Sequence, residues 1–174
     1  MATQSVTAPF DGSVIGEVPK ADAAQVEAAL STAYALYRNR DVWIPKPERI
    51  KILRRAAEII AARRDELATQ AAREGGKPLM DSLVELDRAV DGVENCIEVL
   101  RNEGGKVVPM NVNPASAGRL AFTQFEPIGV VVAVSAFNHP FNLIVHQVGP
   151  AVAAGCPVIV KPAASTPLSC VAFL

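Results

Sequence analysis

The sequence lacks a strong excess of charge, a basic run and a long apolar run. Its 17 lysines and arginines nearly balance its 18 aspartates and glutamates, so the formal net charge is -1 at pH 7. No basic patch interleaved with aromatic residues is present, which gives no reason to expect a nucleic acid partner. No apolar stretch reaches about 18 residues without polar breaks, and the opening MATQSVTAPFDGSVIGEV does not resemble a signal peptide. We therefore expect a cytoplasmic protein without a membrane partner.

Cysteine is scarce as well. The three cysteines, Cys96, Cys156 and Cys170, are odd in number and widely spaced. This pattern is typical of free thiols in a reducing compartment and indicates neither a disulfide framework nor a metal site. Cys156 stands in Ala-Ala-Gly-Cys-Pro at the start of a predicted strand, where a small buried thiol is the ordinary role.

The rest of the composition suits one soluble α/β domain. With 174 residues, of which 50% are hydrophobic and 20% charged, the chain is long enough to bury roughly 70% of its unfolded surface. Residues 6–18 are punctuated by Pro, Asp-Gly and Gly and predict a hairpin. Asp22 predicts a helix N-cap, because Gln25 follows three residues later and completes a capping box.

Two longer helices are predicted next. The first is opened by Pro45 and Pro47, carries an apolar stripe, and ends at Gly75. The second covers residues 81–101, with apolar side chains three and four positions apart. Lys77, in Gly-Gly-Lys-Pro between them, is not a P-loop lysine, because the upstream glycine spacing and the following hydroxyl are missing. The acidic residues of the second helix are predicted to form a solvated face: Glu85, Asp87, Asp91, Glu94 and Glu98.

Residues 129–161 predict a βαβ unit. Val130 to Val134 form a short, β-branched run that is typical of a strand buried on both faces. Gly155 stands where a left-handed helix C-cap would lie, and residues 157–160 predict a second strand. The crossover in such a unit is right-handed in nearly all cases, so the two strands are expected to be parallel. The helix between the strands is indicated by apolar residues at helical spacing: Phe141, Ile144, Val145, Val148 and Val152.

Two polar side chains fall at the carboxyl ends of these strands, where open parallel sheets bind ligands. Asn138 follows the first strand, and Lys161 closes the second. A neutral amide can donate hydrogen bonds to an oxygen that gains negative charge, and an ammonium can donate to ribose hydroxyls or phosphate. The alternative is structural, because Asn before a helix is often an N-cap and Lys at a strand end is often solvated. Spacing alone leaves both alternatives open.

Several motifs together resemble the aldehyde dehydrogenase superfamily. They are REGGKPLMDSLVELDRAVDGVE, FEPIGVVVAVSAFNHPFNL and GPAVAAGCPVIVKPAASTPLS, and the resemblance covers essentially the whole chain in order. Agreement over several motifs is far more specific than a lone glycine pattern. The resemblance implies an α/β fold, the N-terminal part of a Rossmann-type cofactor-binding domain with a β arm for oligomerisation.

The resemblance also implies a mechanism. Members of the family attack an aldehyde with a cysteine thiolate, pass hydride to NAD or NADP, and hydrolyse the thioester with water activated by a glutamate. Asn138 matches the asparagine whose amide stabilises the oxyanion, and Lys161 matches the lysine that holds the adenosine ribose. The strand end beside the cofactor is matched by Ser135, Ala136 and Phe137.

Two departures from the family pattern bear on the site. Many members have Pro-Trp where this chain has Ala136-Phe137, so the wall near substrate and cofactor is expected to have a different shape. Many NAD-preferring members carry glutamate at the position of Ala164, where the carboxylate accepts from the ribose hydroxyls and repels a 2′-phosphate. Because Ala164 removes that repulsion, NADP becomes acceptable and NAD is not excluded.

Three parts are expected along the chain. Residues 1–108 form the N-terminal hairpin and helices of the cofactor-binding domain, residues 109–127 form the β arm, and residues 128–174 form the βαβ unit. Alternation of apolar and polar residues between Pro114 and Pro127 indicates an exposed strand or hairpin. By resemblance this arm reaches a neighbouring subunit, so a homo-oligomer is expected for the full-length protein.

The family's nucleophile and general base are not matched by any residue of this chain. In the family both come later in the sequence than the position of Leu174, and a parallel sheet normally has more than two strands. We therefore expect a fragment of a longer enzyme that acts on a small aldehyde, and no dehydrogenase activity from this chain alone. The alternative is a short, non-catalytic product that binds a nucleotide weakly or pairs through its arm with a full-length subunit.

Overall fold

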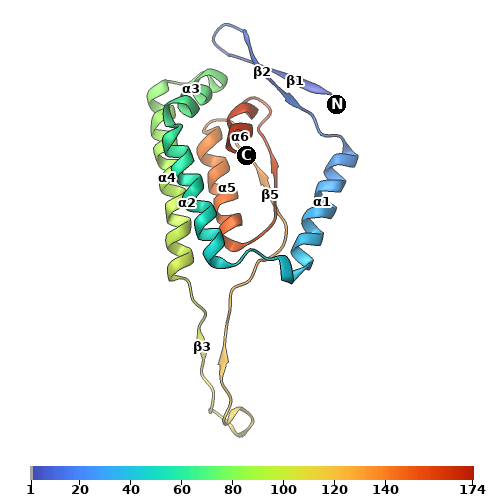
Figure 1. Ribbon diagram of the computed structural model, residues 1–174, viewed down its shortest axis with the longest axis vertical. Helices are drawn as coiled ribbons and strands as arrows, with labels where there is room; N and C mark the ends of the chain where they lie inside the picture. The colour runs from blue at the N-terminus through green and yellow to red at the C-terminus, as the bar shows by residue number, and fades with distance from the viewer. Residues whose placement is uncertain (1) are drawn as a thin grey trace.

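The predicted βαβ unit is confirmed by the computed structural model, which describes residues 2–174. Strands β5 (Val131–Val134) and β6 (Val158–Lys161) pair in parallel over their whole length. Helix α5 (Pro140–Ala154) connects them and packs on the sheet (Figure 1). It ends at Gly155, whose φ of 81° lies in the left-handed region, as the sequence predicts.

The prediction that the first of these strands is buried on both faces is wrong. Ala133 is buried beneath α5, whereas Val132 and Val134 on the other face are 57% and 56% exposed. The helix across the sheet, α1 (Ala23–Arg38), contacts β6 and leaves those two valines open to water. A β-branched apolar run indicates a strand that can be buried on both faces. In residues 2–174 only one face of this strand is covered.

Most of the core lies between α5 and the helices that precede it. Helices α2 (Lys46–Ala62) and α4 (Leu79–Asn102) both pack against α5, and α3 (Arg64–Gly75) packs on α4 (Figure 1). A short helix, α6 (Pro167–Phe173), contacts α3 and α5. The largest cluster of buried apolar side chains comprises Leu53, Ala57, Ile60, Leu67, Ala68, Leu86, Ala89, Val93, Ile97, Leu100, Phe141, Val145 and Ala153.

The single helix predicted between Pro45 and Gly75 is two helices in the structure. The break is at Arg63, whose φ of -103° and ψ of 13° leave the helical range, although its N–H still donates to the carbonyl of Ile59. Two acidic residues then occupy the first turn of α3, where negative charge is favourable. The new direction lets α3 bury its own apolar face against α4.

The N-terminal hairpin and the capping box are confirmed. Strands β1 (Thr3–Thr7) and β2 (Val14–Pro19) are antiparallel, and β2 contacts α6. The Asp22 carboxylate accepts from the Gln25 N–H at 2.8 Å, and the Gln25 side chain accepts from the Asp22 N–H at 3.1 Å, so α1 begins as predicted. A short 3-10 turn (Arg40–Val42) then leads from α1 toward α2.

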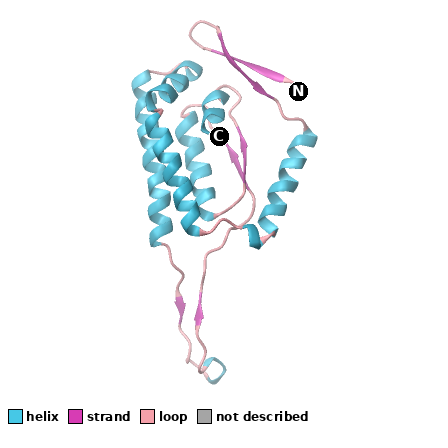
Figure 2. Ribbon diagram, viewed as in Figure 1, coloured by secondary structure: helices cyan, strands magenta, loops and turns pink. Residues whose placement is uncertain are grey.

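A two-stranded arm extends away from the helices (Figure 2). Strand β3 (Val107–Val108) pairs antiparallel with β4 (Ala121–Phe122), and a 3-10 turn (Pro114–Ser116) lies between them. The exposed strand predicted between Pro114 and Pro127 is thus present as β4, and its hairpin partner β3 lies before that range. An arm of this kind offers apolar surface and open strand edges to another chain. Its exposed apolar side chains are Val107, Val108, Val112, Leu120, Phe122 and Phe125.

Two adjacent glycines at the base of the arm differ in the space around them. A Cβ on Gly105 would overlap the carbonyl oxygen of Thr123 across the arm, whereas a Cβ on Gly104 would meet nothing within 4 Å. The two sides of the arm are bonded here, because the Thr123 N–H donates to the Lys106 carbonyl and the Lys106 N–H donates to Thr123 Oγ1, both at 2.8 Å. The close approach therefore requires glycine at position 105 and not at 104.

We predict that Gly105→Ala opens the base of the arm and that Gly104→Ala does not. The new methyl group pushes Thr123 away from Lys106 and breaks both hydrogen bonds, while the two substitutions restrict the unfolded backbone equally. Amide hydrogen exchange should show lost protection at Thr123 in Gly105→Ala and wild-type protection in Gly104→Ala. Equal protection of the Thr123 amide in the two variants would contradict the close approach of residue 105 to the Thr123 carbonyl.

Candidate functional site

A groove of about 700 Å³ lies where strands β5 and β6 end. Its walls are the loops that follow the two strands and the edge of β1. Lys77, which follows α3, also lines this groove, so the structure adds a cation that the sequence does not predict for the site. Three of the residues predicted for the site line the groove: Phe137, Asn138 and Ala164. The other three do not: Ser135, Ala136 and Lys161.

Asn138 is exposed, and its side-chain amide is free. The amide forms no hydrogen bond with any other residue in the range 2–174, while its backbone carbonyl accepts from Lys77 Nζ at 3.3 Å. The alternative role as the N-cap of α5 is wrong, because the N-cap is His139 and α5 has no side-chain cap there. The neighbouring carbonyl, of Phe137, accepts from Thr166 Oγ1 at 3.1 Å. The loop is therefore held through its backbone.

Ser135 and Lys161 end the paired part of the sheet. The Ser135 N–H donates to the Lys161 carbonyl at 3.0 Å. Ser135 is buried, and its hydroxyl donates to the Pro140 carbonyl at 3.4 Å, so this side chain fixes the turn into α5. The Lys161 side chain is exposed and forms no ion pair with the described residues, which leaves its ammonium available to a hydroxyl or an anion.

The remaining two predicted residues are small. Ala136 is half-buried beside the turn. Ala164 is exposed, and its carbonyl accepts from the Gln4 side chain at 2.7 Å. The N-terminal hairpin therefore fixes the loop that follows β6.

The carboxylate of Glu85 binds the first turn of α5. Its Oε1 accepts from the N–H groups of Phe141 at 2.7 Å and Asn142 at 3.0 Å, and its Oε2 pairs with the Lys77 ammonium. A negative charge at a helix N-terminus is favourable, and α5 has no cap of its own. Glu85 is only 1% exposed, so its prediction as part of a solvated face is wrong. The other acidic residues of that face are exposed as predicted: Asp87, Asp91, Glu94 and Glu98.

The carboxylate of Glu74 binds the first turn of α6 in the same way. Its two oxygens accept from the N–H groups of Leu168 at 2.8 Å and Ser169 at 2.6 Å, and it too is 1% exposed. Both helices begin with proline, so the second and third residues carry the first free donors. Because these donors are already bound, neither N-terminus is open to a phosphate, unlike the first helix of many dinucleotide-binding sheets.

A signal for Glu85 is present in the sequence. The structure shows that His139, and not Asn138, precedes the first turn without capping it, so the free N–H groups need a partner from elsewhere. Glu85 also lies four and eight positions before Ala89 and Val93, which is the spacing of apolar residues along one face of a helix. Its spacing therefore puts it on the buried face of α4, although composition alone suggests the solvated one.

None of the three cysteines lines this groove. Cys156 is buried just before β6, at the end of the strand opposite Lys161, as the sequence predicts. Burial raises the pKa of the Cys96 thiol, and burial raises the pKa of Cys170 to about 11, although a hydrogen bond with Ser135 acts in the other direction. Thiols with raised pKa values are poor nucleophiles at neutral pH.

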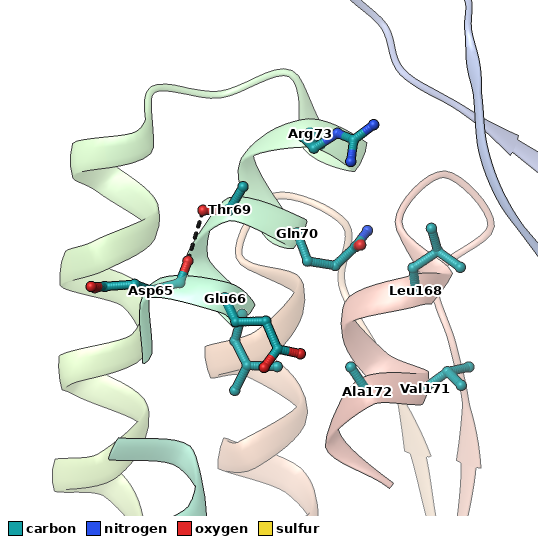
Figure 3. A pocket seen from close by; sticks show the side chains of 9 residues that line it. Asp65, Glu66, Thr69, Gln70, Arg73, Leu168, Val171 and Ala172 are labelled. Carbon is teal, nitrogen blue, oxygen red and sulfur yellow. Dashed lines mark hydrogen bonds between the residues drawn. The ribbon is translucent and has the colours of Figure 1, made fainter. Parts of the chain in front are cut away.

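A second groove, of about 670 Å³, lies between α3 and α6 (Figure 3). Gln70 of α3 points across it toward α6. The Thr69 hydroxyl donates to the Asp65 carbonyl at 2.7 Å and is thus used within α3. No residue predicted for the site lines this groove.

Two features are absent from the described residues. No helix within residues 2–174 is both long enough and apolar enough to cross a membrane. The same residues hold no group of three or more His, Cys, Asp or Glu side chains arranged to bind a metal ion.

Burial raises the pKa of Glu74 above its ordinary 4.5, against the hydrogen bonds from Ser169 and Leu168, which lower it. A raised pKa means that the folded protein holds the proton more tightly than the unfolded chain does. The free energy of unfolding therefore falls as the pH rises from the ordinary value through the folded-state pKa. We predict that Glu74→Gln removes this fall, as measured by denaturant unfolding across the acid range.

Glu66 supplies a control of opposite sign. Its hydrogen bond with Arg63 holds the pKa of Glu66 below the ordinary value, so its contribution to stability is lost as the pH falls through the folded-state pKa. Glu66→Gln should therefore change the pH profile in the opposite sense to Glu74→Gln. If both substitutions changed the pH dependence of the free energy of unfolding in the same sense, the raised pKa of Glu74 would be contradicted.

Comparison with known proteins places the chain in a family. It matches the family model described as the aldehyde dehydrogenase family over residues 2–174. A 3-sulfolactaldehyde dehydrogenase of Priestia aryabhattai is 40% identical over 70% of this chain and 25% of its own length. The chain spans about a third of the length of the curated relatives that it matches from end to end.

Solved structures agree with this match. Aldehyde dehydrogenase 21 from Physcomitrella patens, in complex with succinate, superposes with a TM-score of 0.92 and 30% identity over 99% of this chain and 36% of its own. Glyceraldehyde-3-phosphate dehydrogenase from Methanocaldococcus jannaschii, complexed with NADP, superposes with a TM-score of 0.87 and 30% identity. The match covers 97% of this chain and 36% of that one. The predicted α/β fold class and the resemblance are both confirmed, and the chain belongs to the aldehyde dehydrogenase family.

Proposed function

We propose that this chain provides the oxyanion donor and part of the cofactor site of a longer, NAD(P)-dependent enzyme that oxidises an aldehyde to a carboxylic acid. The observation that carries the proposal is the free side-chain amide of Asn138 in the groove beyond β5. Its loop is held through backbone carbonyls, by Lys77 at Asn138 and by Thr166 at Phe137. A donor that is held before the reaction needs no reorganisation when charge develops.

The role proposed for Asn138 is donation to an oxyanion. When a cysteine thiolate attacks an aldehyde, the carbonyl oxygen gains negative charge as the thiohemiacetal forms, and an amide N–H nearby stabilises that charge. The cysteines of this chain do not line the groove, so the nucleophile is proposed to come from another part of the enzyme. The same is proposed for the base that activates water, because the carboxylates of Glu74 and Glu85 are occupied at helix starts.

The residues of this chain fit NAD or NADP, which accepts the hydride from the aldehyde carbon when it is bound. The exposed Lys161 ammonium at the carboxyl end of β6 suits ribose hydroxyls or phosphate. Ala164 places no carboxylate against a 2′-phosphate, which supports NADP beside NAD, and the related structure from Methanocaldococcus jannaschii holds NADP. Because Glu85 and Glu74 occupy the starts of α5 and α6, other groups are proposed to hold the pyrophosphate.

The arm supports assembly with a second subunit. We keep the division into residues 1–108, 109–127 and 128–174. The middle part, together with its partner strand β3 (Val107–Val108), is the element proposed to pair in a homo-oligomer. The exposed apolar side chains of the arm support this role. They equally favour the second candidate function, in which this chain is a non-catalytic partner of a full-length subunit.

Replacing Asn138 by alanine in the complete enzyme should lower kcat for aldehyde oxidation by on the order of 100-fold, because one oxyanion donor is lost. The KM for the cofactor should change little, since Asn138 is not assigned to cofactor binding. Asn95→Ala, on the exposed face of α4, is the matched control and should keep the wild-type kcat. Steady-state kinetics that give the two variants equal kcat values would refute the role of Asn138.

Ala164→Glu should move the cofactor preference from NADP toward NAD. A carboxylate at this position repels the 2′-phosphate, and a penalty of about 1.4 kcal/mol lowers the ratio of kcat/KM with NADP to kcat/KM with NAD about tenfold. Ala164→Gln has nearly the same size without the charge and should leave the ratio close to that of the wild type. A ratio that is the same in both variants would show that no 2′-phosphate lies near Ala164.

A further inference from the structure

Lys77 lies between two restrained backbone positions. Gly76, before it, ends α3 with a φ of 62°, and Pro78, after it, is the N-cap of α4. A Cβ on Gly76 would approach the Cβ of Pro9 to 3.1 Å, so the N-terminal hairpin is in close contact with this turn. The Lys77 side chain is only 15% exposed. Its backbone is thus fixed, and its ammonium reaches from the α3–α4 turn to the start of α5.

The ammonium of Lys77 has three N–H groups and three acceptors. They are Glu85 Oε2, the carbonyl of Asn138 at 3.3 Å and Nδ1 of His139 at 3.3 Å. The bond to His139 requires a neutral imidazole with its proton on Nε2. Three acceptors thus lie within reach of the Lys77 ammonium, and two of them belong to the loop between β5 and α5.

Glu85 connects this lysine to the start of α5. One of its carboxylate oxygens holds the N–H groups of Phe141 and Asn142, and the other holds Lys77. The start of α5 and the loop before it are thus fixed to one residue of α4. A shift of the Asn138 peptide group would have to break the bond to Lys77 while its neighbours stayed in place.

We propose that Lys77 is a positioning residue for the oxyanion donor: it fixes the peptide group of Asn138 so that the side-chain amide faces the reacting oxygen. The inference rests on the proposed function of Asn138. The acceptors within reach of its ammonium all belong to the protein, and we assign it no donation to the substrate. Its effect on the reaction passes through Asn138.

The contact is tested first in the 174-residue chain, without reference to activity. Lys77→Met keeps most of the stem and removes the three donors. The carbonyl carbon chemical shift of Asn138 should change in this variant. It should stay at the wild-type value in Lys51→Met, which removes an exposed lysine of α2. An unchanged shift in Lys77→Met overturns the proposal.

The positioning role is tested in the complete enzyme by a double-mutant cycle. In the wild-type background Lys77→Met should lower kcat by on the order of tenfold, with an unchanged KM for the cofactor. In the Asn138→Ala background it should lower kcat by less than about twofold, because the group that Lys77 positions is already absent. A merely structural role lowers the folded fraction by the same factor in both backgrounds, so equal losses overturn the proposal.

The outcomes separate this inference from the function on which it rests. If Asn138→Ala lowers kcat and Lys77→Met does not, the positioning role alone fails. If Asn138→Ala leaves kcat unchanged, the proposed function and the positioning role both fail, even where the carbonyl shift moves. Should the methionine variant not fold, Lys77→Gln keeps two N–H donors on an uncharged side chain. It should show a smaller loss of kcat, again confined to the background that contains Asn138.

Discussion

A buried carboxylate is unfavourable unless hydrogen-bond donors compensate its charge. In this protein two glutamates meet that condition in the same way, because each accepts the first free N–H groups of a helix that begins with proline. Glu85 fixes α5 to α4, and Glu74 fixes α6 to α3. The loops that follow β5 and β6 end at these two helix starts, so their positions depend on the two charges. The groove that contains Asn138 is a consequence of this arrangement.

Helix α5 is held at its other end as well. The Arg49 guanidinium of α2 donates to the carbonyl of Ala153 in the last turn of α5. A negative side chain at the start and a positive one at the end both agree with the direction of the helix dipole. Burial lowers the pKa of Arg49, against the opposite effect of Cys156 and Glu103, so the guanidinium too bears a desolvation cost. Because the neighbouring helices α4 and α2 hold its two ends, α5 presents its first turn in one fixed place.

The parts of the fold that the sequence predicts correctly depend on residues close together in the chain. The βαβ unit, the N-terminal hairpin and the exposed arm follow from periodicity and from turn residues. The burial of Glu85 depends on a partner 56 positions away, and local composition favours the wrong assignment. The sequence context of Lys77 predicts no role for it at the site, and its bond to Asn138 is visible only in three dimensions. The alternative of Asn138 as an N-cap likewise stays open until the structure assigns that place to His139.

The arm consists of two strands of two residues each, and an isolated two-stranded hairpin is marginally stable in water. Where such an arm pairs with another chain, its order depends strongly on that partner, and binding includes the conformational entropy of fixing the arm. Part of the free energy gained from its apolar side chains offsets that entropy. Assembly through such an arm would consequently be weaker for its buried area than assembly through a rigid face. It would also weaken more steeply as the temperature rises, because the entropy cost of fixing the arm grows with temperature.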